Sequence, residues 1–231
     1  MKYGLIFDVD GILADTETLV ALATIDMFRE LHGFEPEVED FRPFIGTGPH
    51  RYVEGVAEQY GVSIDLEKAV ATRQEKFLER LGSEYIGFPG ANALIEAAAE
   101  SPDWKLAIAT SSVRSKAEAS LRAAHAPIEH FDAFISGDMV TRRKPHPDIY
   151  LLAAEGLGLP PTRCAGVEDA VTGVESVLAA GMVALAVSNS FPSSELSKAH
   201  RVVSSLEEVT LLQLKELIEN NMARTSSAPT S

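Results

Sequence analysis

The sequence predicts an α/β protein in which helices cover both faces of a parallel sheet, with a block of helices inserted after the first strand. Short apolar runs alternate with segments of helical periodicity from residue 91 to residue 187, and this alternation is typical of a parallel sheet covered by helices. Between residues 16 and 87, in contrast, apolar residues recur at helical spacing without a strand signal. We therefore expect a three-layer α/β/α core and a separate helical bundle.

The first strand is predicted over residues 3–7, an apolar run rich in β-formers that ends in Asp8, Asp10 and Gly11. Side chains two residues apart point to the same side of a strand, and ligands bind at the carboxyl ends of strands in an open parallel sheet. Two carboxylates this close repel each other unless a cation lies between them or one is protonated. Mg²⁺, which prefers hard oxygen ligands, would remove this conflict.

The inserted block is predicted to hold helices over residues 16–33, 50–60 and 66–81, because their apolar residues are spaced to form one buried face each. Gly33 is suited to end the first of these helices. Residues 34–49 contain three prolines and two glycines and are expected to connect the first helix to the second.

After the block, strand and helix signals alternate, and a polar tail follows over residues 223–231 that we expect to be mobile. The predicted series is helix 91–100, strand 105–109, helix 115–124, strand 133–136, helix 147–157, strand 164–167, helix 170–180, a closing strand 183–187 and a last helix 206–221.

Composition restricts the class of protein. An apolar share of 45% and a charged share of 23% are ordinary for a soluble globular protein. The net charge of −14 argues against binding to nucleic acid or to acidic membranes. A single cysteine, Cys164, excludes an internal disulfide and fits a reducing cytoplasm. We expect a cytoplasmic monomer without a signal peptide, in which an anionic substrate needs local compensation from a metal, a lysine or backbone amides.

Hydroxyl groups follow the predicted strand 105–109, at Thr110, Ser111 and Ser112. A hydroxyl placed between a buried strand and a helix is able to donate to a phosphate together with nearby backbone amides. The same hydroxyls are also suited to cap the next helix. Both interpretations stay open, and they are compatible if Thr110 serves the phosphate and a later serine serves as the cap.

Lys144 lies in a rigid turn, because Pro145 and Pro147 flank His146 just before the helix at 147–157. Its side chain is therefore aimed rather than free at the surface, and its charge would neutralise a carboxylate nucleophile and a transferring phosphoryl group. Glu168 and Asp169 follow another predicted strand. They would complete a cage of oxygen ligands for Mg²⁺ opposite Asp8, and the alternative for Asp169 is to cap the following helix.

Four motifs together resemble the haloacid dehalogenase superfamily of phosphohydrolases, with the β-phosphoglucomutase-like branch and its sugar-phosphate phosphatases as the nearest relatives. They are residues 7–17, which read Phe-Asp-Val-Asp-Gly-Ile-Leu-Ala-Asp-Thr-Glu, then 106–112, 144–148 and 166–173. The resemblance extends from Met1 to about Asn221. It implies a Rossmann-like catalytic core over residues 1–15 and 88–222 and a helical cap over 16–87, with hinges near Asp15 and Gly87.

The resemblance also implies the roles of the core residues. Asp8 would attack phosphorus and form an aspartyl-phosphate, and Asp10 would act as the general acid and base. Thr110, Ser111 and Lys144 would hold the phosphoryl oxygens. Mg²⁺ would be bound by Asp8, by the backbone carbonyl of Asp10, and by Glu168 and Asp169.

The resemblance favours a phosphatase acting on a small phosphorylated metabolite, such as a sugar phosphate. The cap histidine of the mutases falls on Val20 here, and their cap arginine falls on about Pro49. Both departures favour a hydrolase, in which water completes the reaction. A phosphosugar mutase is the alternative, and a catalytically silent fold is disfavoured because the core catalytic positions are all occupied. The expected substrate-binding residues are Thr16, Glu17, Gly46, Thr47, Arg51, Lys76, Ser111 and Ser112.

Overall fold

The computed structural model describes residues 2–45 and 47–226, and the chain folds as two compact units. One unit comprises residues 1–14 and 87–231, and the other comprises residues 15–86. The segments where the chain leaves the first unit and returns to it lie next to each other, because Ala14 and Gly87 form an antiparallel bridge. We describe each unit by itself.

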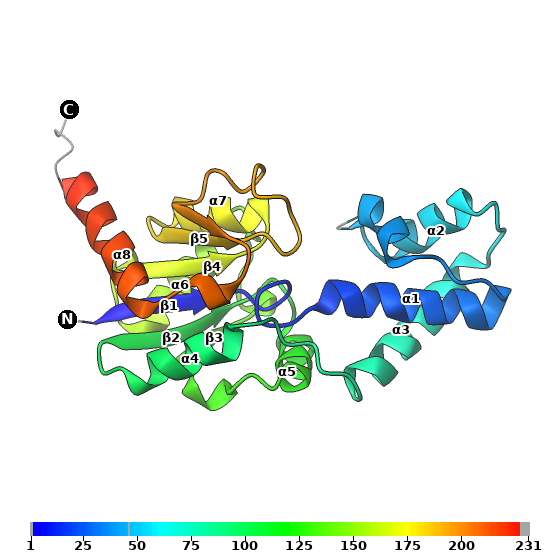
Figure 1. Cartoon of the computed structure of the whole chain (residues 1–231), viewed down its shortest axis with the longest axis horizontal. Coiled ribbons are helices and arrows are strands. Elements are labelled where there is room, and N and C mark those ends of the chain that lie inside the picture. Colours follow the sequence, from blue (N-terminus) through cyan, green and yellow to red (C-terminus); the bar gives the residue numbers. More distant parts are fainter. Residues whose placement is uncertain (1, 46, 227–231) are drawn as a thin grey trace. The chain divides into compact units, whose positions relative to one another are not determined.

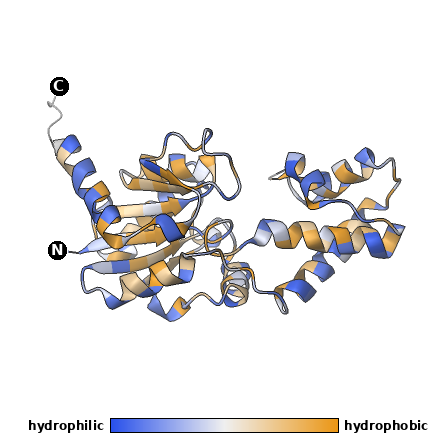
Figure 2. Ribbon diagram, viewed as in Figure 1, coloured by the Kyte–Doolittle hydropathy of each residue, from blue (hydrophilic) through white to orange (hydrophobic). Residues whose placement is uncertain are grey.

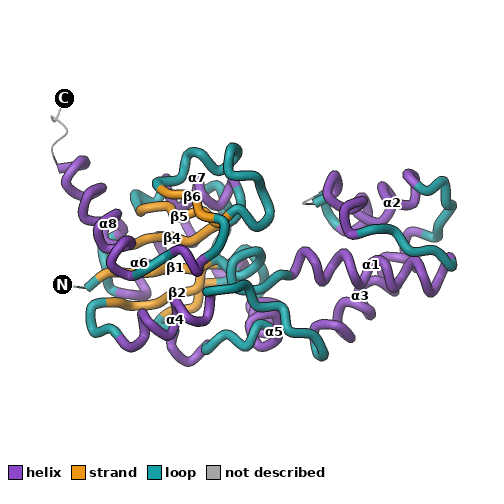
Figure 3. The backbone as a smooth tube through the Cα atoms, viewed as in Figure 1, coloured by secondary structure: helices purple, strands orange, loops and turns teal. Residues whose placement is uncertain are grey.

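The first unit is built on a six-stranded parallel sheet of order β3-β2-β1-β4-β5-β6, which confirms the predicted α/β fold class. Figure 3 shows the strands in orange with helices around them. The strands are β1 (Tyr3–Phe7), β2 (Trp104–Ala109), β3 (Ala133–Ile135), β4 (Cys164–Glu168), β5 (Val183–Val187) and β6 (Arg201–Val203). The topology reverses between β1 and β4, which is where open α/β sheets bind ligands.

Helices cover both faces of this sheet (Figure 1). One face is covered by α6 and α7, and the other by α4 and α8. The α-helices of the unit are α4 (Ala91–Glu100), α5 (Arg114–Ala123), α6 (Asp148–Leu157), α7 (Val171–Ala179) and α8 (Leu211–Ser226), and its 3-10 helices are η2 (Ile128–His130), η3 (Gly137–Met139), η4 (Pro161–Arg163) and η5 (Leu206–Glu208).

The core of the first unit lies between the sheet and these helices. Ile6 of β1 and Ala107 of β2 are fully buried against Ala153 and Leu157 of α6. Because both faces of the sheet are covered, the central strands are mostly apolar rather than alternating, and Figure 2 shows orange segments along the sheet. This rigid platform carries the polar residues at its carboxyl edge.

The second unit is helical. It consists of α1 (Thr16–His32), the 3-10 helix η1 (Val38–Phe44), α2 (Pro49–Gln59) and α3 (Leu66–Leu81). Asp15 caps α1 by accepting from the backbone N–H of Thr18, and Gly33 ends it with a φ of 71°. The three predicted α-helices are present, and the predicted connection between the first two contains η1.

Two sequence predictions need correction at the C-terminal side of the sheet. The strand 183–187 does not close the series, because Arg201–Val203 adds a sixth strand parallel to β5. The last helix begins at Leu211 rather than at Leu206, since Thr210 and Gln213 exchange hydrogen bonds that form a capping box.

That helix also continues to Ser226, so the first four residues of the predicted tail are helical, while residues 227–231 lie outside the described part of the chain. No helix in the described ranges has both the length and the apolar composition that crossing a membrane requires.

Gly90 provides a test of this packing. It precedes α4 with a φ of 79°, and a Cβ atom there would lie 2.4 Å from the backbone nitrogen of Glu207. Gly181 has a similar φ of 77° but nothing within 4 Å of its Cβ position. We expect Gly181→Ala to lower the free energy of unfolding by about 1–2 kcal/mol through backbone strain, and Gly90→Ala by about 1–3 kcal/mol more through the steric clash. Urea unfolding measures both, and equal losses would contradict this packing.

Candidate active site

The register of the sheet aligns the ends of three strands. Phe7 of β1 pairs with Ile108 of β2 and with Val167 of β4. Because neighbouring parallel strands end at the same edge, the residues that follow these pairs come together there. They are Asp8 and the residues around Thr110 and Glu168. The register of the backbone therefore fixes where the residues of the candidate site lie relative to one another.

The loop after β1 is held by hydrogen bonds within itself and by one hydrogen bond from the segment that follows β5. The carbonyl of Val9 accepts hydrogen bonds from the backbone N–H groups of Leu13 and Ala14. The side-chain amide of Asn189 donates to the carbonyl of Gly11 at 2.7 Å. Gly11 has a φ of 81°, and a Cβ atom there would lie 1.8 Å from Oδ2 of Asp169. Only glycine permits both this conformation and this close approach.

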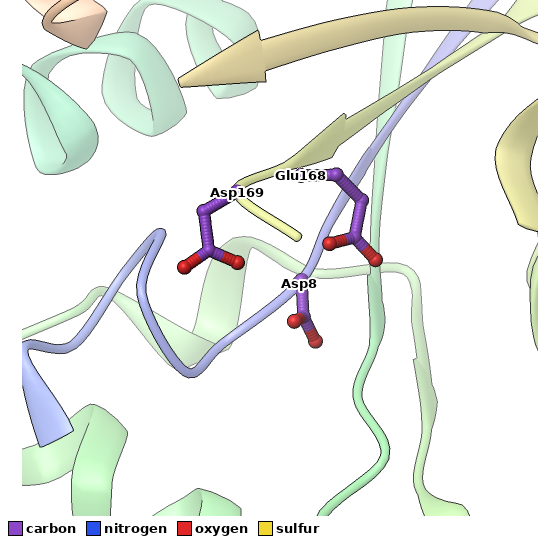
Figure 4. Close-up of side chains that lie close together, drawn as sticks. All are labelled: Asp8, Glu168 and Asp169. Carbon is purple, nitrogen blue, oxygen red and sulfur yellow. The ribbon is translucent and has the colours of Figure 1, made fainter. Parts of the chain in front are cut away.

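Asp8, Glu168 and Asp169 form a buried carboxylate cluster. Each offers a ligand oxygen, and these oxygens all lie within 4.8 Å of one another. Figure 4 shows the three side chains next to one another at the ends of β1 and β4. They are 8%, 0% and 4% exposed, respectively. Three carboxylates so close together in a buried place repel one another strongly unless positive charge compensates them.

Lys144 supplies part of that charge. Its ammonium group lies 2.6 Å from Oε1 of Glu168 and 3.1 Å from Oδ1 of Asp8, and it also donates to the carbonyl of Ala109 at 3.2 Å. Burial alone would lower the pKa of Lys144, but the attraction of the two carboxylates outweighs burial and raises the pKa above its ordinary value. The lysine is therefore charged, and the structure brings it to the carboxylates as the sequence predicts.

One lysine does not compensate three carboxylates. Burial raises the pKa of Asp8 well above its ordinary value, and the neighbouring carboxylates add to this effect while Lys144 opposes it. Burial, followed by repulsion from Glu168, raises the pKa of Asp169 to about 7, against the hydrogen bond that Ser190 donates to it. In addition, Oε2 of Glu168 is buried and accepts no hydrogen bond within the described residues.

These observations fit a bound divalent cation. The donors are hard carboxylate oxygens, which Mg²⁺ prefers, and the buried Oε2 of Glu168 needs a partner. A cation among Asp8, Glu168 and Asp169 would provide that partner and would offset the repulsion among the three carboxylates.

Asp10 lies in a different environment from Asp8. Its side chain is 28% exposed, and Nζ of Lys116 lies 3.7 Å from its Oδ1. Its Oδ2 accepts a hydrogen bond of 2.7 Å from the hydroxyl of Ser112. Ser112, predicted to bind substrate, thus contacts Asp10. The sequence did not predict Lys116 as a site residue, because a lysine on a helix such as α5 usually faces solvent.

The residues predicted as possible helix caps do not cap the helices that follow them. The N-cap of α5 is Val113, and the side chain of Asp138 accepts from the backbone N–H of Arg114 instead. Thr110 is fully buried, and its hydroxyl accepts from the backbone N–H of Ser112 at 3.1 Å. The N-cap of α7 is Ala170, without a side-chain cap. Asp169 is therefore available to the carboxylate cluster.

Other residues that complete the site gave no signal in the sequence. Tyr150 of α6 donates to Glu168 at 2.7 Å, Ser190 donates to Asp169, and Asn189 holds the loop at Gly11. All three reach the site from segments far from their partners in sequence. Only a three-dimensional structure places them there.

The remaining predicted substrate residues belong to the helical unit, and two of them are held in ion pairs. Arg51 pairs with Glu58 at 2.9 Å and with Glu54 at 3.3 Å, and Lys76 pairs with Glu30 at 2.8 Å and with Glu79 at 3.4 Å. The hydroxyl of Thr47 donates to the carbonyl of Phe44. Thr16 and Glu17 begin α1, and Gly46 lies outside the described residues. Their roles toward a substrate remain predictions.

Comparisons with known proteins agree with the resemblance seen in the sequence. Residues 4–181 match the family model of the haloacid dehalogenase-like hydrolases. The chain is 38% identical over 203 residues to the Protein SUPPRESSOR OF QUENCHING 1, chloroplastic, of Arabidopsis thaliana, a match that covers 84% of this chain but only 18% of that protein. It is 35% identical over 215 residues to Hexitol phosphatase A of Escherichia coli, which covers 90% of this chain and 93% of that protein.

A solved structure gives the same picture. The crystal structure of a putative β-phosphoglucomutase from Thermotoga maritima matches with a TM-score of 0.77 and 28% identity, covering 92% of this chain and 99% of that chain.

The pKa of Asp169 generates a test of the carboxylate cluster. Its folded-state value of about 7 lies above the ordinary value of 3.8, so the folded state binds this proton more tightly than the unfolded state. The stability from this group is complete below the unfolded pKa and is lost as pH rises through the folded pKa. In chelator-treated protein, we expect Asp169→Asn to raise Tm relative to the wild type at pH 8 more than at pH 5.

Added Mg²⁺ should raise the Tm of the wild type at pH 8 and have much less effect on Asp169→Asn, because the variant lacks one ligand. Differential scanning fluorimetry measures both effects. An equal rise in Tm for both proteins would show that the cation does not bind at Asp169.

Proposed function

The chain belongs to the haloacid dehalogenase-like hydrolases, and we propose that it is a Mg²⁺-dependent phosphatase that hydrolyses a small phosphorylated sugar or a related metabolite. The observation that carries this proposal is the difference between the two aspartates after β1. Asp8 is buried beside Lys144, whereas Asp10 is partly exposed and bonded to Ser112. Two carboxylates with distinct environments are suited to distinct roles in one reaction.

Asp8 takes the role of nucleophile. Its carboxylate oxygen attacks phosphorus, a new O–P bond forms, and the bond from phosphorus to the substrate oxygen breaks. Asp10 donates a proton to that leaving oxygen. In the second half of the reaction, Asp10 accepts a proton from a water molecule, whose oxygen attacks phosphorus and displaces Asp8 as inorganic phosphate is formed.

The surrounding residues support these steps through charge and orientation. Lys144 keeps positive charge beside Asp8, and we assign it to contact a phosphoryl oxygen. We assign Thr110 and Ser111, which follow β2, as donors to the other phosphoryl oxygens. Mg²⁺ held by Asp8, Glu168 and Asp169, together with the backbone carbonyl of Asp10, would neutralise negative charge on the transferring group.

A polar shell around Asp10 supports its role in proton transfer. Ser112 donates to Oδ2 and fixes the orientation of the carboxyl group. Lys116, at 3.7 Å from Oδ1, places positive charge beside the same carboxyl group. Both residues belong to the same compact unit as Asp8 and Lys144.

The relatives support the proposed substrate class. The similarity to Hexitol phosphatase A, over most of both chains, supports a phosphorylated sugar or sugar alcohol as substrate. Thr16, Glu17, Thr47, Arg51 and Lys76 of the helical unit, with Gly46, are the residues that we propose to distinguish one such substrate from another. The expected location in the cytoplasm and the expected monomeric state are part of this proposal.

The direct test is release of inorganic phosphate from a panel of phosphosugars and an aryl phosphate, with and without Mg²⁺. We expect Asp8→Asn to lower kcat by about 10³-fold or more because no nucleophile remains, and Asp10→Asn by about 10²–10⁴-fold because proton transfer is lost. Asp65→Asn is the control, since Asp65 caps α3 and asparagine caps equally well.

The other outcomes decide between the alternatives. Interconversion of glucose 1-phosphate and glucose 6-phosphate with little free phosphate would identify a mutase. Full activity of Asp8→Asn would contradict the assigned nucleophile, and an absence of turnover on the whole panel would favour a silent fold.

A further inference from the structure

Tyr150 is a buried phenol that contacts the carboxylate cluster but has no part in the steps above. It lies on α6, its side chain is fully buried within the core of the sheet, and its hydroxyl donates to Oε1 of Glu168 at 2.7 Å. A phenol hydroxyl has a proton to donate and an ionised carboxylate only accepts, so Glu168 is the acceptor of this bond.

The two oxygens of Glu168 have unequal surroundings. Oε1 accepts from both Tyr150 and Lys144, at 2.7 and 2.6 Å. Oε2 is buried without a hydrogen-bond donor among the described residues. The carboxyl group also lies against α7, where a Cβ atom added at Gly173 would be 2.0 Å from its carboxyl carbon. The two donors and the backbone of α7 thus limit how this carboxylate turns.

Lys144 alone is a weaker restraint on that orientation. Its ammonium group is a compact charge on a flexible chain, and it is shared between Glu168 and Asp8. The terminal torsion of a glutamate is also broad. The hydroxyl of Tyr150, in contrast, is attached to a rigid ring that the core holds in place. Both donors contact Oε1, but the hydroxyl of Tyr150 is the one whose position the core fixes.

We propose that Tyr150 is a positioning residue for the cation site: by holding Oε1 of Glu168, it directs Oε2 toward the cation and keeps Lys144 shared with Asp8. This inference rests on the proposed function, because it assigns Tyr150 a role toward the proposed Mg²⁺. Hydrogen bonds to metal-binding side chains are a general way in which proteins orient ligands, and their loss weakens metal binding by about 10–100-fold.

The chain contains a matched control. Tyr3 is also buried, at 2% exposed, and its hydroxyl donates to Oε1 of Glu219 at 2.6 Å. Tyr3 begins β1, whereas Asp8 follows the end of that strand. Tyr150→Phe and Tyr3→Phe therefore each remove one phenol-to-carboxylate hydrogen bond and retain the ring, but only the first is next to the proposed cation.

The experiment measures Mg²⁺ affinity directly, by isothermal titration calorimetry on chelator-treated full-length protein, for the wild type and both variants. We expect the dissociation constant for Mg²⁺ to rise about 10–100-fold in Tyr150→Phe and to be unchanged in Tyr3→Phe, although Tm falls in both. Phosphate release by Tyr150→Phe should then recover toward the wild-type kcat at saturating Mg²⁺, because the nucleophile and Lys144 remain.

Three outcomes would overturn the proposal. If Tyr150→Phe loses stability but binds Mg²⁺ like the wild type, the hydroxyl has only a structural role. Equal weakening in Tyr150→Phe and Tyr3→Phe would show a general effect of stability on binding. If the wild type binds no Mg²⁺ and releases phosphate without it, the metal part of the proposed function fails as well, so the two failures are distinguishable.

Discussion

The site depends on an excess of buried negative charge. Three carboxylates, Asp8, Glu168 and Asp169, share a space less than 5 Å across with one buried lysine. Such a group is unfavourable in a protein interior, because removing charges from water is opposed by a large loss of solvation. The surrounding fold nevertheless brings the carboxylates together through the aligned ends of β1 and β4. A divalent cation bound among the three carboxylates would offset their mutual repulsion.

Small residues and rigid segments allow the three carboxylates to lie this close together. Gly11 allows the loop after β1 to approach Asp169, and Gly173 leaves space for Glu168 beside α7. The sheet beneath them is apolar and covered on both faces, so it has little freedom to move the charged groups apart. The residues proposed for chemistry and those proposed for substrate choice also lie in different parts of the chain. The carboxylates and Lys144 lie in one compact unit, and most of the expected substrate residues lie in the other.

Much of this was predictable from the sequence, because the informative residues directly follow apolar runs. Asp8, Thr110 and Glu168 each come after a strand, and parallel strands end at one edge of a sheet. Tyr150, Lys116 and Ser190 were not predictable, since their partners are distant in sequence and their own positions read as ordinary helix or loop residues. The strand Arg201–Val203 is only three residues long, too short for a periodic pattern. The start of α8 was also not predictable, because the helical pattern of the sequence extends upstream to Leu206. The reciprocal hydrogen bonds of Thr210 and Gln213, which fix the start at Leu211, are visible only in the structure.

The most direct test of this account is the position of a cation in a crystal of the protein soaked with Mn²⁺, which replaces Mg²⁺ at sites of oxygen ligands and scatters anomalously. The account predicts one anomalous peak at about 2 Å from oxygens of Asp8, Glu168 and Asp169, with Lys144 still beside Asp8 and Glu168. A fully soaked crystal with no peak among these three carboxylates, or with a peak only elsewhere, would contradict it.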